Sequence, residues 1–287
     1  MASHAERSMS FGAVAGDYDR LRPGPPPEAI DWLLPAHPDV VVDLAAGTGL
    51  LTRALAGKAG QIIAIEPDER MRSVLERHTH GVRVLAGRGE AIPLPDASAD
   101  AVLVSSAWHW FNSDLATAEV ARILRDGGRL GVIWTGRSRG IEWLRADDWF
   151  AEVRAEEEAA ARRQTAAGAA AGGQPLPEGA DPVSADEVAT GPRHPESADS
   201  QIQLPDQALF RSIETHAFRF SRYMTVPDII DMLATYSGVI TASPEARAAG
   251  RARAAAALAA QFPGAAELEV PMRSRCWRAN RVSRPGR

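Results

Sequence analysis

Short apolar runs alternate with amphipathic stretches through the first half of the chain. The amphipathic stretches repeat apolar side chains every three or four residues, as Met71, Val74 and Leu75 do over residues 69–78. The apolar runs have the length of buried strands and predict strands at 40–44, 61–66, 82–85, 101–105 and 130–134. Strands that alternate with helices at this spacing form βαβ units on a mostly parallel sheet. The predicted fold class is therefore α/β, with helices on both faces of the sheet.

The predicted helices lie near 28–34, from about residue 50, and at 69–78, 115–124, 227–235 and 244–261. The helix over 115–124 is expected to stop at Arg125-Asp126-Gly127-Gly128, where glycines can take positive φ. A last strand is expected near 268–277. The pattern thus resumes after a long interruption.

That interruption, over residues 156–200, consists mainly of Ala, Gly, Pro, Glu and Arg. Its bulky apolar residues are Leu176, Val183 and Val188. Such a segment buries too little apolar surface to offset its ordering entropy, so we expect a mobile insertion, helical before Gln164 at most. The expected organisation is a core with an N-terminal lid at 1–137, the start of a cap and a low-complexity flexible insertion at 138–208, and cap helices with the final strands at 209–287.

Composition narrows the class of partner. The net charge of −5 and pI near 5.8 give no general field that would attract nucleic acid or an anionic membrane, so neither is expected as a partner. The start MASHAERSMS lacks the apolar core of a signal peptide, and no apolar run could span a bilayer, so we expect a cytoplasmic protein. No His, Cys and carboxylate set has metal-ligand spacing, and no metal is expected. Lysine occurs once among 32 basic residues, which is typical of a GC-rich bacterial genome.

The stretch VVVDLAAGTGLL, residues 40–51, predicts a buried strand, a tight glycine turn and a helix whose first amides face a ligand. A dinucleotide-binding loop would carry a third glycine where Thr52 stands, and here Asp43 precedes the turn. Both features argue against a dinucleotide. An acid before the glycines, with a second acid, Glu66, at the end of the second strand, is the alternative pattern.

This pattern resembles the class I S-adenosylmethionine (SAM) methyltransferases. The stretches EPDERMRSVL, GRGEAIPLPDASADAVLVSSAWHWF and VARILRDGGRLGVIW resemble successive motifs of a small-molecule branch that includes ubiquinone/menaquinone C-methyltransferases and trans-aconitate methyltransferase-like proteins. The resemblance covers residues 11–137 closely and 209–278 more loosely. It implies a Rossmann-like, seven-stranded sheet with a final antiparallel strand, a small helical cap, SAM as cofactor and S-adenosylhomocysteine (SAH) as product. Ala45 replaces a common glycine, which an ordinary φ would tolerate.

The resemblance also implies a set of cofactor-binding positions. Glu66 stands where a carboxylate accepts two hydrogen bonds from ribose hydroxyls. Tyr18 and Arg22 would close over the cofactor, with Arg22 near its carboxylate, although both could simply pack the N-terminal helix. The full expected set is Tyr18, Arg22, Asp43, Ala45, Gly47, Gly49, Glu66, Pro67, Met71, Gly89, Glu90 and Ser105.

The aromatic run Trp108-His109-Trp110-Phe111 follows the fourth strand, where the resemblance places the transferred methyl group. Trp108, His109 and Trp110 are the expected acceptor-binding residues, with Trp108 facing the cleft and Trp110 or Phe111 buried. His109 is the one histidine expected at this edge and is the candidate catalytic base or orienting group; the alternative is a structural role.

The sequence therefore predicts a SAM-dependent methyltransferase that acts on a small molecule, in bacterial secondary or specialised metabolism. Two alternatives stay open: a SAM-binding enzyme that catalyses a non-methylating reaction such as cyclisation, and a non-catalytic, SAM-binding regulatory protein. The acceptor, the atom that is methylated and the oligomeric state are not readable from the sequence.

Overall fold

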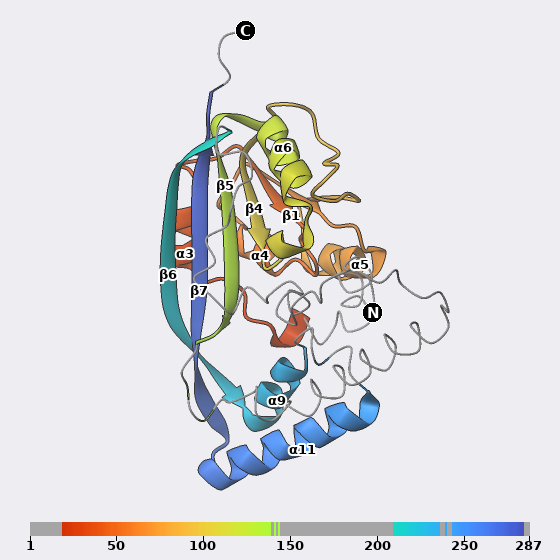
Figure 1. The fold of residues 1–287 in the computed structure, drawn as a ribbon, viewed down its shortest axis with the longest axis vertical. Coiled ribbons are helices and arrows are strands. Elements are labelled where there is room, and N and C mark those ends of the chain that lie inside the picture. The colour runs from red at the N-terminus through yellow and green to blue at the C-terminus, as the bar shows by residue number, and fades with distance from the viewer. Residues whose placement is uncertain are drawn as a thin grey trace, which may run out of the picture.

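A computed structural model describes residues 19–138, 141, 143, 209–235, 239 and 243–283. Within these ranges one sheet has the strand order β3-β2-β1-β4-β5-β7-β6 (Figure 1). Its strands are β1 (Val40–Leu44), β2 (Gln61–Ile65), β3 (Arg83–Leu85), β4 (Ala99–Ser105), β5 (Leu124–Arg137), β6 (Phe210–Thr225) and β7 (Glu267–Arg281). Strands β1 to β5 pair in parallel, and β7 runs antiparallel to both β5 and β6. The predicted mostly parallel, seven-stranded α/β sheet is confirmed.

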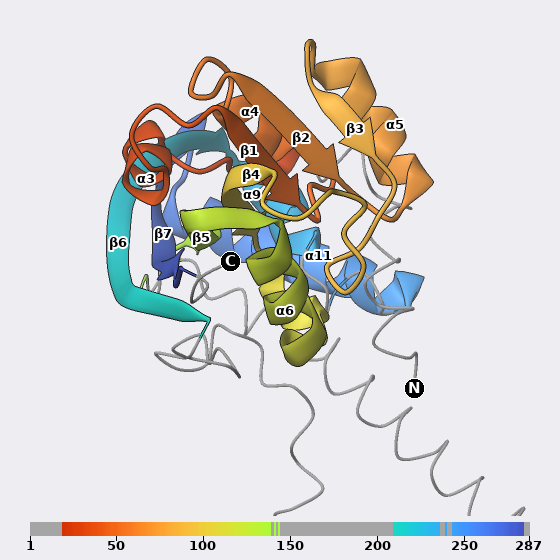
Figure 2. The ribbon, with the colours of Figure 1, turned by 90° about the horizontal axis from the view of Figure 1, so that it is seen from above.

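The sheet is apolar on both faces because alternate side chains of each strand enter different cores. Val41 packs with α3 (Pro27–Leu33) and α4 (Leu50–Ala54), whereas Val42 packs with α6 (Ser113–Ile123) on the opposite face. The helix α5 (Glu69–His78) contacts β2 on the α4 side through Leu75. Figure 2 shows α3 and α4 on one side of the sheet and α6 on the other. This two-sided burial accounts for the nearly continuous apolar runs of the strands.

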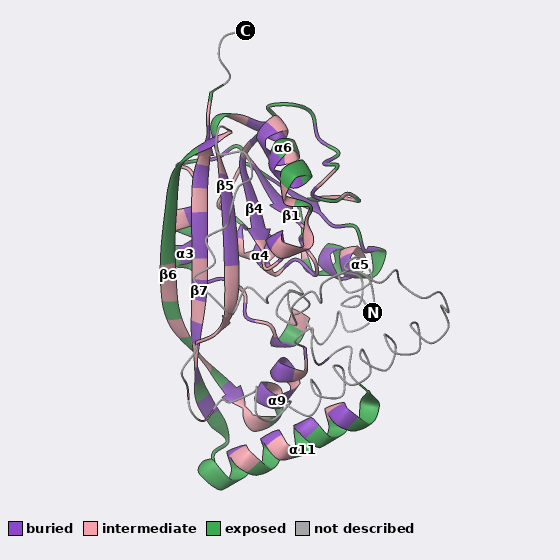
Figure 3. Ribbon diagram, in the orientation of Figure 1, coloured by how far each residue is buried: buried purple, intermediate pink, exposed green. Residues whose placement is uncertain are grey.

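Two helices form a cap beyond the carboxyl end of β4. They are α9 (Val226–Ala234) and α11 (Pro244–Gln261), and they pack against the lower ends of β6 and β7 in Figure 1. One side of α11 is buried at every fourth residue, from Ala246 through Gly250 and Ala254 to Leu258. Figure 3 shows that buried side facing α9 and the exposed side facing away. Leu21, from the start of the described chain, is only 2% exposed and joins the same cluster.

The structure differs from the sequence expectation most clearly in β5. This strand begins at Leu124, directly after α6, rather than at residue 130. Leu124 pairs with Ala99, and a register shift then accommodates the glycines before Arg129 pairs with Ala101. Gly127 does take the expected positive φ, 75°, but within the strand rather than beyond a helix. The predicted insertion at 156–200 lies outside the described residues.

In the described part of the chain no helix is both long and apolar enough to cross a bilayer.

Candidate functional site

The chain reverses the direction of strand order between β1 and β4, and this defines the site. The loop after β1 leads to α4 on one face, and the loop after β4 leads to α6 on the other. In open α/β sheets, ligands bind in the crevice that such diverging loops leave at the carboxyl ends of the strands. Four loops meet at this edge: residues 45–49, 66–68, 86–98 and 106–112.

The loop after β1 is a tight turn with three residues at positive φ. They are Ala45 at 58°, Gly47 at 58° and Gly49 at 89°. A Cβ on Gly49 would lie 3.0 Å from Cγ of Leu75, so this glycine also permits the close approach of α5. The expectation that Ala45 keeps an ordinary φ is wrong, because it adopts the left-handed conformation that costs an L-residue roughly 1 kcal/mol. Backbone strain of this kind is often found at ligand-binding loops.

Asp43, the last residue but one of β1, is fully buried. Its Oδ2 accepts a hydrogen bond from Oγ1 of Thr52 at 2.5 Å, which ties β1 to α4. Its Oδ1 has no partner among the described residues, and the same is true of buried Oγ1 of Thr48. Burial, with a smaller contribution from the charge of Glu66, raises the pKa of Asp43 from 3.8 to about 7.

This raised pKa predicts a pH dependence of stability. Between pH of about 4 and about 7, native Asp43 holds a proton that the unfolded chain has released, so the free energy of unfolding should fall as the pH rises. Asp43→Asn should flatten part of this slope, because the amide oxygen still accepts from Thr52 but the side chain no longer titrates. Urea unfolding of both proteins across that window measures the effect, and equal slopes would contradict the assignment. Glu66 contributes in the same direction, since its pKa is also raised.

Glu66 connects the loops that follow β1 and β2. Its Oε2 accepts from the backbone N–H of Gly47 at 2.9 Å, and its Oε1 accepts from the N–H of Asp68 at 3.0 Å. Burial raises the pKa of Glu66, and these two hydrogen bonds oppose that effect. A carboxylate offers about four acceptor positions, so two remain for a ligand. The side chain is 7% exposed at the edge of the sheet.

The segment after Glu66 is fixed by side chains around it. Arg72 Nη1 donates to the carbonyl oxygens of Glu66 and Pro67 at 2.8 and 2.7 Å. Asp68 caps α5 by accepting from the N–H of Arg70 at 2.9 Å. Pro67 is exposed at this edge, whereas Met71 is 6% exposed. The two expected adenine neighbours thus differ in accessibility.

The loop after β3 is joined to the loop after β4. A Cβ on buried Gly89 would lie 3.0 Å from ring atoms of Phe111, so the absence of a side chain lets this ring pack on the loop. Oε1 of Glu90 accepts from the N–H of Asn112 at 2.8 Å. Asn112 in turn caps α6 through the N–H of Leu115. These contacts fix the aromatic segment relative to the rest of the edge.

The aromatic segment forms a single 3₁₀ turn, η2 (Trp108–Trp110), after Ser105, the last residue of β4. Trp108 is 6% exposed and meets Phe111 edge to face, with ring centroids 5.7 Å apart. Trp110 and Phe111 are only partly buried, and Trp110 lies 4.7 Å from the ring of His109. The expected division of burial is therefore wrong: Trp108 is the buried ring. The buried ring of Trp108 anchors the 3₁₀ turn on the core, and the partly exposed rings of the segment belong to Trp110 and Phe111.

Of the two expected lid residues, Tyr18 lies outside the described ranges. Arg22 is described and contacts the cap: its Nε donates to Oγ1 of Thr235 at 2.9 Å, and its Nη2 to the carbonyl of Thr235 at 3.0 Å. Asp19, nearby, accepts from Nη2 of Arg53 at 2.7 Å and lies 3.1 Å from Nδ1 of His78. The N-terminal turn, residues 19–22, is thus attached to α9 at one end and to α4 and α5 at the other.

Sequence reasoning does not identify two residues that hold this site, Thr52 and Thr235. In the sequence, Thr52 stands out only as the residue at the third glycine position of a dinucleotide loop, yet it binds Asp43. Its hydroxyl, on the third residue of α4 and close to the motif acid, is an available signal. Thr235 gave no signal, because it meets Arg22 across 213 positions of the sequence.

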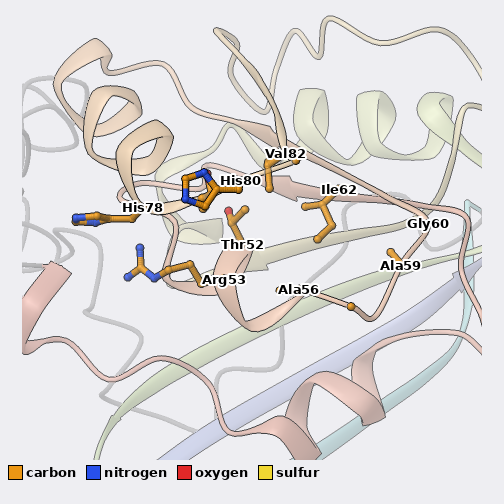
Figure 4. A pocket seen from close by; sticks show the side chains of 12 residues that line it. Thr52, Arg53, Ala56, Ala59, Gly60, Ile62, His78, His80 and Val82 are labelled. Carbon is orange, nitrogen blue, oxygen red and sulfur yellow. The ribbon is translucent and has the colours of Figure 1, made fainter.

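A surface groove of about 290 Å³ lies elsewhere, between α4 and α5 (Figure 4). Arg53, His78 and His80 are among the residues that line it. Gly60 and Val82, also in its lining, directly precede β2 and β3, so the groove faces the amino ends of these strands. It is separate from the four loops at the carboxyl edge.

Comparisons with known proteins agree with this geometry. A family model described as a methyltransferase domain matches residues 42–132. Uncharacterized methyltransferases of Mycobacterium bovis and Mycobacterium tuberculosis are each 36% identical over 245 residues, covering 85% of this chain and 84% of theirs. A structure from Anaeromyxobacter dehalogenans, assigned as a type II methyltransferase, has a TM-score of 0.63 at 20% identity, covering 92% of this chain and 99% of its own.

The mycobacterial relatives establish the family, since their similarity extends over most of both chains. The solved structure supports the fold. The narrower likeness to quinone and aconitate methyltransferases stays a prediction. The chain therefore belongs to the methyltransferases, and its sheet, glycine loop and strand-end acid place it in the class I, SAM-dependent family.

Proposed function

We propose that the protein transfers a methyl group from SAM to a small-molecule acceptor and releases SAH. The observation that carries this proposal is the bond between Glu66 and Gly47, which joins the acid after β2 to the glycine turn after β1. The residues present fit SAM. Glu66 retains acceptor positions for two ribose hydroxyls, and buried Oδ1 of Asp43 lacks a partner within the described residues.

When bound, SAM supplies a methyl group on a positively charged sulfur, and SAH is the leaving group. The protein then has to hold the acceptor nucleophile in line with the methyl–sulfur bond, and this positioning can account for much of the rate. The backbone at Ala45, Gly47 and Gly49 would face the methionine part. Pro67 and Met71 would lie beside the adenine. Gly89, Glu90 and Ser105 would complete the cofactor side.

Arg22 and Tyr18 would close over the cofactor from the N-terminal turn. Arg22 already bonds Thr235, so a contact with the cofactor carboxylate requires it to share or leave that partner. The same movement of Arg22 would change its contact with Thr235, at the end of α9, when the cofactor binds. A carboxylate contact would thus couple the cofactor site to the cap.

The acceptor would lie against the segment Trp108-His109-Trp110. Its rings would keep water from the sulfonium, and His109 would orient the nucleophile or take its proton. We place this reaction in bacterial specialised metabolism, in the cytoplasm and without a nucleic acid partner, in keeping with the net charge of −5.

Incubation with methyl-labelled SAM and a panel of small acceptors tests the proposal. Label in an acceptor, with an equal amount of SAH, is the expected result by mass spectrometry. An unlabelled, rearranged product would favour the non-methylating alternative. SAM binding without any product would favour the regulatory alternative.

A further inference from the structure

An arginine-rich patch lies on the α6 face of the sheet, close to the acceptor side of the site. Trp134 pairs with Arg275 and Gly136 with Arg273 across β5 and β7. Arg273 also pairs with Arg219 on β6. Directly paired residues project from the same face of a sheet. We call Trp134, Gly136, Arg219, Arg273 and Arg275 the arginine–tryptophan patch.

The patch begins where β4 ends. The last pair between β4 and β5 is Ser105 with Ile133, and the N–H of Ser106 donates to the carbonyl of Ile133 at 2.8 Å. Trp134 is the next residue of β5, and it packs against the core cluster that contains Trp108. Trp110 packs against that cluster as well. The patch therefore borders the same core cluster as the turn that we expect to hold the methyl acceptor.

Two buried donors in the patch have no hydrogen-bond acceptor among the described residues. They are Nε1 of Trp134 and Nε of Arg273, and neither has a partner in the part of the chain that the structure describes. Leaving a buried donor without an acceptor is unfavourable, and more so when the donor is charged. The two donors belong to successive residue pairs on the same face of β5 and β7. They indicate a place where a ligand supplies the acceptor atoms.

Shape and charge restrict what that ligand can be. A Cβ placed on Gly136, the partner of Arg273, would meet no atom of the described residues within 4 Å, so the described part of the chain leaves open space at this position. The acids that share this face of β7 are Glu267 and Glu269, and Pro271 separates them from Arg273. Neither Arg219 nor Arg273 forms an ion pair with any described acid. Guanidinium groups and an indole N–H only donate, so the complementary group is an anion.

We propose that the arginine–tryptophan patch binds a carboxylate or phosphate of the methyl acceptor, and that the acceptor is therefore an acidic small molecule. This inference rests on the proposed function. Arg273 and Trp134 hold the acidic group over Gly136, and the remainder of the acceptor extends to the turn at Trp108-His109-Trp110. Planar guanidinium groups suit a carboxylate or phosphate because they donate two parallel hydrogen bonds.

Calorimetry on the full chain saturated with SAH tests this proposal with benzoate, citrate and inorganic phosphate as probes and benzamide as the neutral control. At least one anion should bind, and benzamide should not. Arg273→Met should weaken anion binding at least about tenfold, because it removes a charged, bidentate donor. Trp134→Phe should weaken it about threefold, because it removes one neutral donor. The preference between benzoate, citrate and phosphate identifies the acidic group.

Arg211→Met is the matched control, because this exposed arginine of β6 pairs with Asn280 on the opposite face of the sheet. It should leave anion binding unchanged, and all three variants should keep the SAH affinity. Equal weakening by Arg211→Met, or equal binding of benzamide, would overturn the proposal. If SAH binds and no anion does, this inference fails alone; if SAH does not bind, the proposed function fails instead.

Discussion

Replacing Glu66 with alanine should lower the affinity for both SAM and SAH by about 10- to 150-fold. The variant loses two charge-assisted hydrogen bonds to the ribose, which corresponds to about 1.5–3 kcal/mol. It also loses the bonds that hold the N–H groups of Gly47 and Asp68, so the glycine turn becomes less well positioned. Titration calorimetry on the folded variant measures the change.

Two further variants separate ribose binding from loop positioning. Glu66→Gln keeps one oxygen for a backbone N–H but loses the negative charge, and its affinity should fall between those of the wild type and the alanine variant. Asp68→Asn removes a neighbouring charge while its oxygen still caps α5, and it should leave affinity unchanged. Unchanged SAM affinity in Glu66→Ala would disprove the ribose assignment. A loss in Asp68→Asn as large as in Glu66→Ala would attribute the effect to general charge at this edge.

Replacing His109 with alanine should reduce kcat by roughly 100-fold while leaving SAM affinity nearly intact. The reason is its place in η2, directly after β4, beside Trp110 and next to the expected methyl group. An interaction made mainly in the transition state lowers kcat without weakening cofactor binding. Steady-state kinetics with the acceptor found by the labelling experiment, together with SAM calorimetry, measures both quantities.

The choice of substitution distinguishes a base from an orienting group. His109→Gln keeps a hydrogen-bonding side chain but cannot titrate near neutral pH. If His109 orients the nucleophile, glutamine should restore much of the rate, and if it takes a proton, glutamine should be as slow as alanine. His80→Ala, in the groove that faces the amino ends of β2 and β3, is the matched control and should keep the wild-type rate. Full turnover in His109→Ala would mean that the histidine is structural and that positioning suffices.

The parts of the fold that follow from local pattern were predictable. The strand β1 and the helices α5 and α11 begin and end where the sequence indicates, because apolar periodicity and capping residues are local signals. The continuation of β5 through Gly127 and Gly128 was not predictable in this way. Two glycines and an aspartate favour a turn, but pairing of Leu124 with Ala99 and of Arg129 with Ala101 and Asn280 holds both ends of the segment in the sheet.

The candidate site was predictable at the level of its loops but not of its side-chain contacts. The sequence places Glu66 at the correct strand end, since carboxyl ends of parallel strands share one edge. It does not show that Ala45 takes a positive φ, because that conformation belongs to the turn as it packs in the folded protein. Nor does it bring Trp134 to Arg273, because that proximity depends on an antiparallel register between residues more than a hundred positions apart.

The N-terminal turn, residues 19–22, is held partly by exposed ion pairs, so its attachment should be more sensitive to ionic strength than the sheet is. Besides the Asp19 and Arg22 contacts, Nη1 of Arg20 lies 2.6 Å from Oδ1 of Asp228 on α9, and the Arg20 side chain is 54% exposed. Salt weakens exposed ion pairs, since the screening length falls to about 3 Å at 1 M salt, whereas it does not screen the apolar contacts that hold the sheet together. Concentrated salt should thus loosen the cap from the glycine loop while the sheet stays intact, so buffer composition would set how readily ligands enter and leave.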